Sequence, residues 1–394
     1  ISPPLTKKIQ LTVVSLVLRL ENFLLVFLTR LLFSQLNVAP QKILIYKVGN
    51  IGDIVCAVPS FIAIREAYPQ AKITLLTSPG VRGAIGANEL LQGATYIDEL
   101  IVYFTEDIDT SAKKRNLVRN LRKKQFNLCI QLPNNLAKFR TIVRNMVFAK
   151  AIGVRSAIGF VVRTSQIFKK TQVDYLINKT EVESLIDLLR DNNVAVSRIE
   201  YKFNISQEQK IKVSNLLKGK WPDIRNRKII IAISAGGKRE TNQWPQERFS
   251  QIAKYLQHTY NTRIIIIGGK GDNKRAEALS AGLAKEKTLN VSGELSLLET
   301  FQLLQSCTFL ISNSTGPIHL AAACHIPTVG LYGVRDVFGS WFPYGKRHKI
   351  LFHKFINCNY RDEACIKKSI DTITVDEVKR ACDDLIKEFP KNEQ

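Results

Sequence analysis

Residues 42–60 read KILIYKVGNIGDIVCAVPS, and this stretch decides the fold. The run 43–46 is aliphatic, β-branched or aromatic, which predicts a short strand buried on both faces. Gly49 and Gly52 then permit a sharp turn into an apolar helix that begins near Asp53. A strand, a glycine turn and a helix in this order predict the first unit of a nucleotide-type α/β domain.

The carboxylate of Asp53 has two interpretations. An aspartate at a helix start commonly caps the free amide groups of the first turn, which is a purely structural role. Alternatively, Asp53 is a general base at the mouth of a cleft. The spacing G-x-x-G-D differs from the G-x-G-x-x-G of dinucleotide sites, and an acid here would repel a pyrophosphate. The local residues leave both roles open.

The composition indicates a globular protein with an anionic partner. The chain has 394 residues, of which 45% are hydrophobic, and a formal charge of +23. This length accommodates two or three domains, and the charge favours nucleic acid, an anionic membrane surface or a phosphorylated substrate. From Ser111 to Val173 there are fifteen Lys or Arg residues and no Asp or Glu. A solvated helix face explains any one of these cations, but not the complete absence of acids.

The seven cysteines are an odd number, and several lie in apolar surroundings. This pattern indicates reduced core thiols in a cytosolic protein. Cys358, Cys365 and Cys382 are spaced too irregularly for a zinc site. We therefore expect no metal site.

Residues 9–33, IQLTVVSLVLRLENFLLVFLTRLLF, predict a long amphipathic helix. Arg19, Glu21 and Asn22 interrupt the apolar run that a membrane-spanning helix would need. We expect the helix to lie in the membrane interface, where its basic side chains meet anionic headgroups. The alternative is a helix that packs on the body of the protein or in a dimer. A signal peptide fits less well, because no A-x-A-like site follows.

The rest of the chain reads as two α/β halves. Strands alternate with helices up to about residue 194, and a charged stretch at 206–228 is the expected linker. The alternation then resumes between Lys228 and Tyr332. Two doubly wound units predict a ligand cleft between the carboxyl edges of their sheets. The expected division is 1–40 for the N-terminal helix, 41–215 for the first domain, 216–375 for the second domain and 376–394 for a C-terminal helix and tail.

A second constellation follows the strand predicted at 308–311. The segment SNSTGPIHLAAA, residues 312–323, offers small hydroxyls, a glycine and a proline suited to the first helical position. Free amides at a helix start together with hydroxyls form a phosphate cradle. A histidine on the first turn could donate to a phosphate or ribose oxygen, but a lone histidine is equally often a core residue. The candidate contacts are Ser314, Thr315, Gly316 and His319.

Two further loops leave strands of the same half. In SAGGKRETNQWP, Gly236 allows close approach of a ligand, and Lys238 or Arg239 could neutralise a diphosphate. In GGKGDN, Asp272 could accept hydrogen bonds from ribose hydroxyls. Three such loops on one half make a nucleotide diphosphate its expected ligand.

Together these motifs resemble those of the family-9 glycosyltransferases, whose best-known members are ADP-heptose:lipopolysaccharide heptosyltransferases. The resemblance extends over about residues 40–380. It rests on KILIYKVGNIGD at 42–53, QWPQERF at 243–249, SNSTGPIHLAAA at 312–323 and LYGVRD at 331–336. It implies a GT-B fold with two Rossmann-like domains facing each other across a cleft. It also implies an N-terminal acceptor domain, a C-terminal donor domain and an inverting transfer that needs neither a metal nor a cofactor.

The resemblance implies that Asp53 is the catalytic base, and that Thr315, Gly316 and His319 contact the donor diphosphate. Two positions depart from the family pattern, which usually has Lys or Arg in place of Asn242 and Asp in place of Ser314. Lys238 or Arg239 could replace the lost cation, and the sugar or nucleotide could differ. The candidate acceptor contacts are Gly52, Lys113, Lys114, Arg115 and Arg163.

The expected activity is transfer of a sugar, by resemblance heptose from ADP-heptose, to a phosphorylated lipopolysaccharide-core or related glycolipid. Relatives with this layout work on the cytoplasmic face of the bacterial inner membrane. One alternative is a nucleotide-sugar epimerase of the same two-domain design. Another is a non-catalytic binder of anionic lipid or nucleic acid, although no aromatic-interleaved basic motif indicates specific nucleic-acid recognition.

Overall fold

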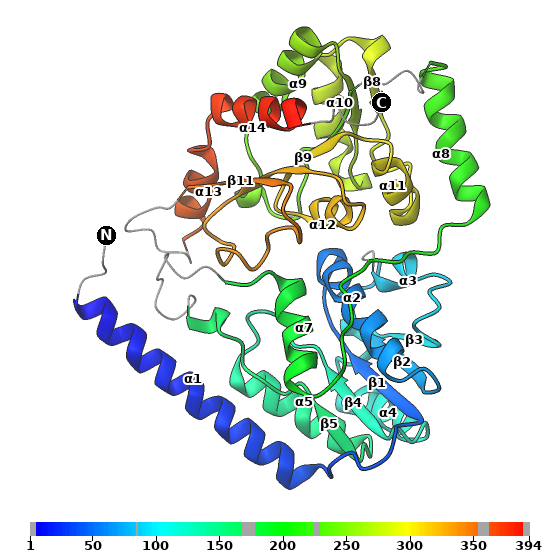
Figure 1. Ribbon diagram of the computed structural model, residues 1–394, viewed down its shortest axis with the longest axis vertical. Helices are drawn as coiled ribbons and strands as arrows, with labels where there is room; N and C mark the ends of the chain where they lie inside the picture. Colours follow the sequence, from blue (N-terminus) through cyan, green and yellow to red (C-terminus); the bar gives the residue numbers. More distant parts are fainter. Residues whose placement is uncertain (1–4, 84–85, 168–177, 224–228, 354–361, 389–394) are drawn as a thin grey trace. The chain divides into compact units, whose positions relative to one another are not determined.

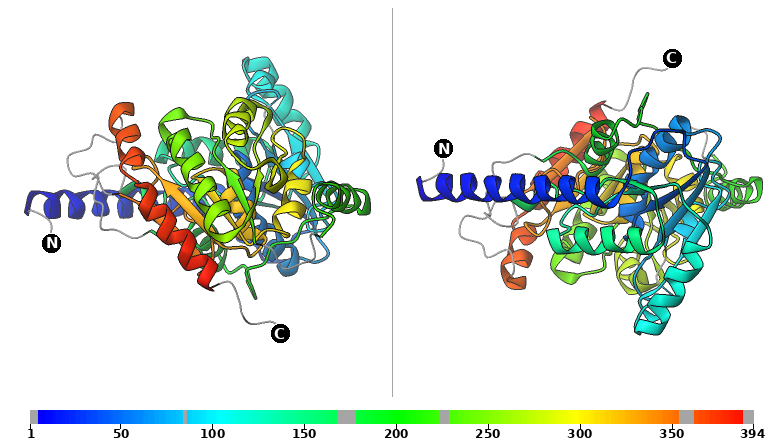
Figure 2. Two further views of the ribbon diagram at one scale, coloured as in Figure 1. Left: turned by 90° about the horizontal axis from the view of Figure 1, so that it is seen from above. Right: turned by 90° about the horizontal axis from the view of Figure 1, so that it is seen from below.

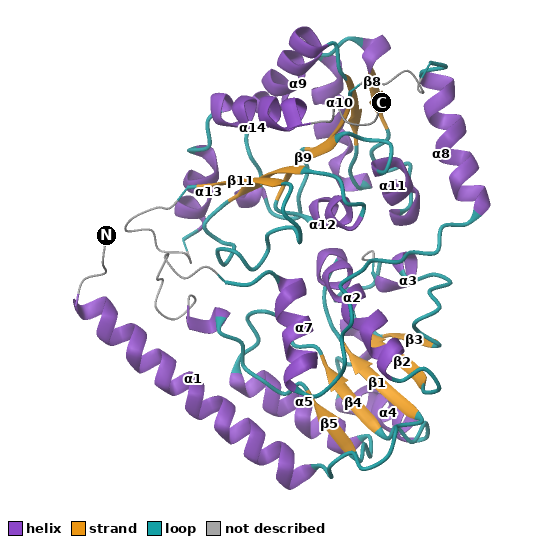
Figure 3. Ribbon diagram, viewed as in Figure 1, coloured by secondary structure: helices purple, strands orange, loops and turns teal. Residues whose placement is uncertain are grey.

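The computed structural model describes residues 5–83, 86–167, 178–223, 229–353 and 362–388. The chain divides into two compact units. The first takes the residues up to Lys202 together with Val337–Ser340, and the second takes Phe203–Asp336 and the residues from Trp341 onward. Each unit contains one parallel sheet with helices packed around it (Figures 1 and 3). The predicted α/β class with two parallel sheets is therefore confirmed.

The sheet of the first unit has five parallel strands in the order β3-β2-β1-β4-β5. They are β1 (Lys42–Tyr46), β2 (Lys72–Thr77), β3 (Glu99–Val102), β4 (Leu128–Gln131) and β5 (Ser156–Ile158). The helical elements are α1 (Leu5–Leu32), α2 (Ile51–Ala67), α3 (Ala87–Leu90), η1 (Thr105–Asp107), α4 (Ser111–Arg122), α5 (Phe139–Ala151) and α7 (Glu181–Asp191). Strand β1 is central because it is apolar on both faces: Ile43, Leu44 and Ile45 are fully buried.

The second unit has a six-stranded parallel sheet in the order β11-β10-β9-β6-β7-β8. The strands are β6 (Ile230–Ser234), β7 (Arg263–Ile266), β8 (Thr288–Asn290), β9 (Phe309–Asn313), β10 (Thr328–Tyr332) and β11 (His348–Phe352). Around them lie α8 (Gln207–Lys220), η2 (Glu240–Asn242), α9 (Gln246–Tyr260), η3 (Lys270–Asp272), α10 (Asn273–Ala281), η4 (Lys285–Lys287), α11 (Leu297–Leu304), α12 (Gly316–Ala323), α13 (Glu363–Asp371) and α14 (Val375–Glu388).

Most of the stretch expected to be a linker is helical. Helix α8 begins at the N-cap Ser206, whose hydroxyl accepts a hydrogen bond from the amide of Gln209. Val213 and Leu217 of this helix are buried, and α8 packs against α11 within the second unit. A charged composition alone does not exclude a helix that buries only two apolar side chains.

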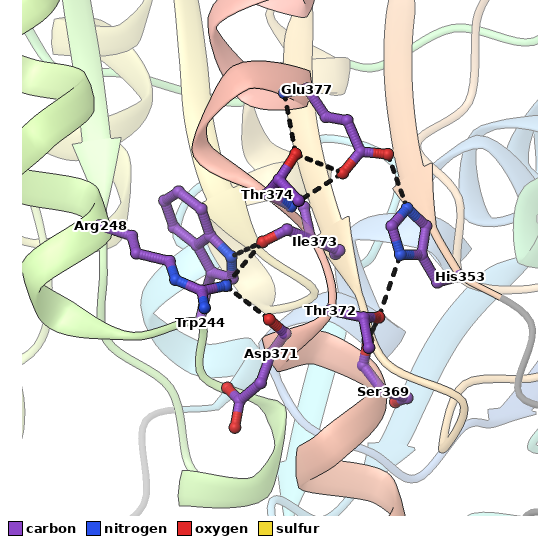
Figure 4. Close-up of polar contacts among 9 residues, drawn as sticks. All are labelled: Trp244, Arg248, His353, Ser369, Asp371, Thr372, Ile373, Thr374 and Glu377. Carbon is purple, nitrogen blue, oxygen red and sulfur yellow. Dashed lines mark hydrogen bonds and ion pairs between the residues drawn. The ribbon is translucent and has the colours of Figure 1, made fainter.

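The motif QWPQERF, residues 243–249, forms hydrogen bonds with the segment that connects α13 to α14 in the second unit. The indole nitrogen of Trp244 donates to the carbonyl of Ile373 at 2.8 Å, and the guanidinium of Arg248 donates to the same carbonyl at 2.8 Å (Figure 4). Glu377 accepts from the amide of Thr374 and contacts Nε2 of His353 at 2.7 Å. These contacts hold the connection between α13 and α14, so the motif has a structural role.

Helix α1 packs on the first unit along one face only. Leu18 and Leu25 are buried in its core, and the helix runs beside α5 (Figures 1 and 2). The side-chain amide of Asn22 donates to the carbonyl of Val162 at 2.9 Å and accepts from its amide at 2.8 Å. Asn22 therefore lies on the packed face, while the exposed face of α1 is apolar and includes Leu20, Phe23 and Phe27.

Helix α1 also includes a segment, Lys8–Leu32, that is long and apolar enough to cross a membrane, and it is the one such segment within the described residues. Only a small share of it is buried in the protein. The packing alternative thus holds for one face of the helix, and the other face is exposed.

Candidate active site

Asp53 lies in the first turn of α2, at the carboxyl end of the central strand β1. The helix begins earlier than predicted, because Asn50 is the N-cap and Asp53 is the third helical residue. The amide of Asn50 donates to Oδ2 of Asp53 at 2.9 Å. Asp53 therefore helps to cap the helix, as its structural interpretation requires, but from the third helical position and not as the N-cap.

The two glycines of the turn have different roles. A Cβ atom on Gly49 would lie 2.3 Å from Cβ of Asp53, so any larger residue would displace the carboxylate. Gly52 is helical, within α2, and does not need the special backbone angles that the sequence suggested. Gly52 lies next to Asp53 in the first turn of α2. This position is compatible with its predicted contact with the acceptor.

Buried charges surround Asp53. Burial raises the pKa of the Asp53 carboxyl, the ammonium of Lys47 lowers it, and the carboxylate of Glu181 raises it. Lys47 Nζ lies 3.2 Å from Glu181 Oε1, and both side chains are fully buried. Glu181 Oε2 lies 2.6 Å from Arg163 Nη1. A base with a raised pKa is closer to the neutral pH at which a general base works best.

Sequence reasoning missed Lys47 and Glu181. The sequence held a signal for Lys47, because this lysine directly follows the apolar run 43–46, and a lysine so close to a buried strand needs a partner. No local signal existed for Glu181, which reads as an ordinary acid in the first turn of a helix. Their contact spans 134 residues of sequence, so only the fold reveals it.

The candidate acceptor residues fall into two groups. Lys113, Lys114 and Arg115 are exposed in the first turns of α4, and Lys113 Nζ contacts Asp109 at 3.0 Å. Arg163 is instead nearly buried, with 8% of its side chain exposed, and it forms an ion pair with Glu181. Lys113 and Arg163, two cations of the acid-free segment, are thus paired with acids that lie outside it. Because they are exposed, the cations of α4 are better candidates than Arg163 for binding an anionic ligand.

Asn313 joins two of the predicted donor loops, and sequence reasoning did not single it out. Its side chain is fully buried at the end of β9. Its amide nitrogen donates to the carbonyls of Ala235 at 2.9 Å and Gly236 at 3.1 Å, and its Oδ1 accepts from the amide of Trp244 at 2.9 Å. One side chain therefore holds the loop after β6 against the loop after β9.

The start of α12 is left without a side-chain cap. Thr315 is the N-cap, but its hydroxyl donates back to the carbonyl of Asn313 at 3.2 Å and makes no capping hydrogen bond. Gly316 opens the helix, and Pro317 carries no amide hydrogen. The first-turn amides of α12 thus suit an anionic ligand, as the predicted phosphate cradle requires. His319 is buried in the same helix, with its ring edge-on to Trp341 at 5.9 Å.

Two buried oxygen atoms near this loop lack partners. Ser314 donates its hydroxyl to the carboxylate of Asp336, whose pKa burial raises to about 6. Oδ2 of Asp336 and Oδ1 of Asn242 are both buried without a hydrogen-bond partner. Arg335 Nη1 contacts the hydroxyl of Thr241 at 3.3 Å, so the loops carrying these two acceptors touch. Buried acceptors in this state are suited to a ligand that donates hydroxyl or amino hydrogens.

The other predicted donor residues lie on the loops after β6 and β7. The carboxylate of Asp272 lies directly beside Gly236 and accepts from the amide of Gly269 at 2.9 Å. Lys238 and Arg239 are exposed on the loop after β6. A cavity of about 400 Å³ opens beside this loop, and its lining residues are Arg239, Glu240, Thr241, Glu363 and Lys367.

The expectation about cysteines needs one correction. Cys56, Cys129, Cys307, Cys324 and Cys382 carry free thiols, but Cys365 is disulfide-bonded, and Cys358 lies outside the described residues. Disulfide formation depends on which thiols the fold brings close, which spacing does not reveal. Within the described ranges, no group of three or more His, Cys, Asp or Glu residues could hold a metal ion.

Comparisons with known proteins agree on one family. The model described as glycosyltransferase family 9 (heptosyltransferase) matches residues 114–370, a range that excludes Asp53. Lipopolysaccharide heptosyltransferase 2 of Escherichia coli K12 is 22% identical over 305 residues, covering 74% of this chain and 83% of that protein.

Two solved structures have the same fold. The family-9 glycosyl transferase from Veillonella parvula aligns with a TM-score of 0.71 at 19% identity, covering 90% of this chain and all of that one. The ADP-heptose lipopolysaccharide heptosyltransferase II of Escherichia coli aligns with a TM-score of 0.61 at 19% identity, covering 88% and 99%. At these identities the likeness concerns the fold alone.

Proposed function

This chain belongs to glycosyltransferase family 9 and is a glycosyltransferase, and we propose that it transfers heptose from ADP-heptose to a phosphorylated lipopolysaccharide-core acceptor. The names of its relatives support this choice of sugar and acceptor. The observation that carries the proposal is Asp53, a carboxylate with a raised pKa in a first helical turn at the carboxyl end of β1. Open α/β sheets bind their ligands at that end.

In the proposed reaction, the second oxygen of Asp53 takes the proton from an acceptor hydroxyl. The acceptor oxygen forms a bond to the anomeric carbon while the bond from that carbon to the diphosphate oxygen breaks, with inversion. The nucleoside diphosphate leaves with the electron pair. No metal or cofactor is required for this balance of atoms, because the donor supplies its own leaving group.

The donor is assigned to the loops of the second unit. Negative charge grows on the diphosphate as its bond to the sugar breaks, so fixed amide groups and cations lower the barrier most when they contact that group. The uncapped first turn of α12 supplies amides at Gly316 and beyond, and Lys238 and Arg239 supply charge. Asn242 and Ser314, which depart from the family pattern, and Asp272 are assigned to the sugar or nucleoside, with His319 beside the diphosphate.

The acceptor is assigned to the first unit and the membrane to α1. Lys113, Lys114 and Arg115 would hold phosphate groups of the glycolipid, with Gly52 beside the reacting hydroxyl. The exposed apolar face of α1 would enter the membrane interface, which matches a peripheral enzyme on the cytoplasmic face of the inner membrane. Because α1 packs on α5 of the same unit, a helix bound to the membrane would carry this acceptor surface with it.

The first experiment tests donor and base together. Thermal shifts with ADP-, UDP-, GDP- and dTDP-sugars should single out ADP-heptose, because a ligand that binds only the folded state raises its melting temperature. Transfer to heptose-deficient lipopolysaccharide should then fall by about 100-fold or more in Asp53→Asn, which removes the base.

Asp191→Asn, an exposed change in α7, is the matched control and should keep full activity. An Asp53→Asn variant that transfers sugar at the wild-type rate would exclude this residue as the base. Conversion of the donor sugar without an acceptor would instead identify an epimerase.

A further inference from the structure

The ion cluster beneath Asp53 joins three separate segments of the first unit. Lys47 directly follows β1, Glu181 is the first residue of α7, and Arg163 follows β5. Each oxygen of Glu181 contacts one cation, Oε1 with Lys47 at 3.2 Å and Oε2 with Arg163 at 2.6 Å. The side chains of Lys47 and Glu181 are fully buried, and that of Arg163 is 8% exposed.

Stability alone is a weak explanation for such a cluster. The desolvation of buried ions commonly outweighs their mutual attraction, so a well-packed apolar group of similar volume would often serve as well. The cluster also lies beside a reacting group: α7, which begins with Glu181, packs against α2, which carries Asp53 in its first turn, and the charges of both Lys47 and Glu181 act on Asp53. The arrangement is therefore better explained by what it does to Asp53.

We propose, on the basis of the function proposed above, that Glu181 is a positioning residue that holds the ammonium of Lys47 away from Asp53. The charge of Lys47 acts on Asp53, but its direct contact, at 3.2 Å, is with Glu181. Without that contact, the buried ammonium would pair with Asp53, the remaining carboxylate that feels its charge. A base locked in an ion pair accepts a proton less readily, so Glu181 preserves the basicity that the transfer needs.

The charges around Asp53 have definite signs. Lys47 lowers the pKa of Asp53, whereas Glu181 and burial raise it, and the amide of Asn50 lowers it by hydrogen bonding. Cys56, one turn further along α2, is buried among the same charges, and burial raises its own thiol pKa well above the usual value. The guanidinium of Arg163, which is paired with Glu181, lowers the pKa of the Cys56 thiol.

Two substitutions should therefore shift the pKa of Asp53 in opposite directions. Glu181→Gln removes a negative charge and releases Lys47, so the pKa of Asp53 should fall by about one unit. Lys47→Gln removes the positive charge and leaves Glu181 paired with Arg163, so the pKa should rise by a similar amount. Opposite shifts show that both charges act on Asp53. If Glu181 acts by holding Lys47 away, Glu181→Gln should lower the pKa of Asp53 less in the Lys47→Gln background than in the wild-type protein, and an equal shift in both backgrounds would overturn the positioning role.

Carboxyl carbon NMR titration of aspartate-labelled full-length protein measures these shifts directly, with Asp53→Asn used for assignment. The titration needs no substrate. In parallel, the acid limb of the pH profile of kcat should move to lower pH in Glu181→Gln. The plateau of kcat should fall by about 3-fold with KM unchanged, because a weaker base transfers a proton more slowly. Asp191→Asn, on the same helix, is the control and should move neither quantity.

The outcomes separate this proposal from the proposed function. Unchanged titration of Asp53 in both variants, or shifts in the same direction, would overturn the role of Glu181. If the wild-type protein transfers no sugar, the proposed function fails while the titration still decides the positioning role. If Glu181→Gln does not fold, Lys47→Gln carries the test, and a lowered or unchanged pKa of Asp53 in that variant overturns the proposal.

Discussion

The carboxylate of Asp272 occupies the space that a side chain on Gly236 would need. A Cβ atom on Gly236 would lie 2.1 Å from Oδ1 of Asp272, closer than any real contact. The absence of a side chain on Gly236 therefore admits the neighbouring loop, and its predicted contact with the donor stays a prediction. The loops after β6 and β7 are thereby packed together at one edge of the second sheet.

Gly236→Ala should therefore displace Asp272 and lower the stability of the second unit by about 1–3 kcal/mol through overpacking. Donor binding should weaken as well, because both residues are assigned to the donor site. Tryptophan fluorescence during urea unfolding measures the effect, since Trp221, Trp244 and Trp341 all lie in the second unit.

Two comparisons test the cause. The double variant Gly236→Ala/Asp272→Ala should recover most of the lost stability, because the clash is gone. Gly271→Ala, where a Cβ would meet nothing within 4 Å, should have little effect. A double variant no more stable than Gly236→Ala would contradict the steric explanation.

Asn313 provides a second prediction, about the loops that surround the donor. Replacing it with alanine leaves the amide of Trp244 and the carbonyls of Ala235 and Gly236 buried without their partner. The expected loss is about 2–4 kcal/mol, since unpaired buried polar groups are costly. The midpoint of tryptophan-detected urea unfolding should fall accordingly. Asn120→Ala on the exposed face of α4 is the control, and an equal effect of both changes would contradict this account.

Asp336 should make stability depend on pH in a particular direction. Burial raises the pKa of its carboxyl from 3.8 to about 6, so the folded state binds a proton more tightly than the unfolded state. Stability is then greatest below the unfolded pKa and falls as pH rises through the folded pKa. From pH 5 to pH 7.5 we expect a loss of about 1 kcal/mol from this group, after allowance for partial exposure of the residue.

Asp336→Asn should remove this pH-dependent contribution to stability. The difference in unfolding free energy between the wild-type protein and the variant should therefore change by about 1 kcal/mol between pH 5 and pH 7.5. Urea unfolding at the two pH values measures it. Asp376→Asn is the matched control, because that carboxylate is 78% exposed. If Asp336→Asn loses stability relative to wild type as pH rises, the assigned sign is wrong.

The exposed face of α1 predicts binding to anionic vesicles. Leu20, Phe23 and Phe27 are 59%, 68% and 56% exposed, and each would bury apolar surface in the membrane interface. Changing all three to serine should weaken co-sedimentation with phosphatidylglycerol vesicles by about 100-fold or more, given roughly 1.5–3 kcal/mol for each large apolar side chain.

Ile211→Ser on α8 is the control, because it removes an exposed apolar side chain from a different element. Unchanged vesicle binding in the triple variant would exclude this surface as the membrane contact. Loss of a dimer by light scattering, without loss of vesicle binding, would show that α1 pairs with a second copy of the chain.

Local sequence determined much of this protein. The apolar run 43–46 had to become a central strand, because a parallel strand needs both faces covered. The turn after this strand and the helix that begins at Gly316 were readable as well, because glycine and proline mark turns and helix starts locally. The phosphate contact at 314–316 stays a prediction. The strand, the turn and the helix start depend on residues within one turn or one strand of each other, and local chemistry decides them.

Tertiary structure alone decided the surroundings of those features. Glu181 reaches Lys47 across 134 residues, and Asn313 reaches Ala235 across 78. Likewise, no local rule indicated that Arg163 is committed to an ion pair, or that Asn22 turns toward the protein and leaves an apolar face of α1 exposed. Burial and pairing of a polar group depend on which distant segment the fold brings against it, and sequence periodicity does not carry that information.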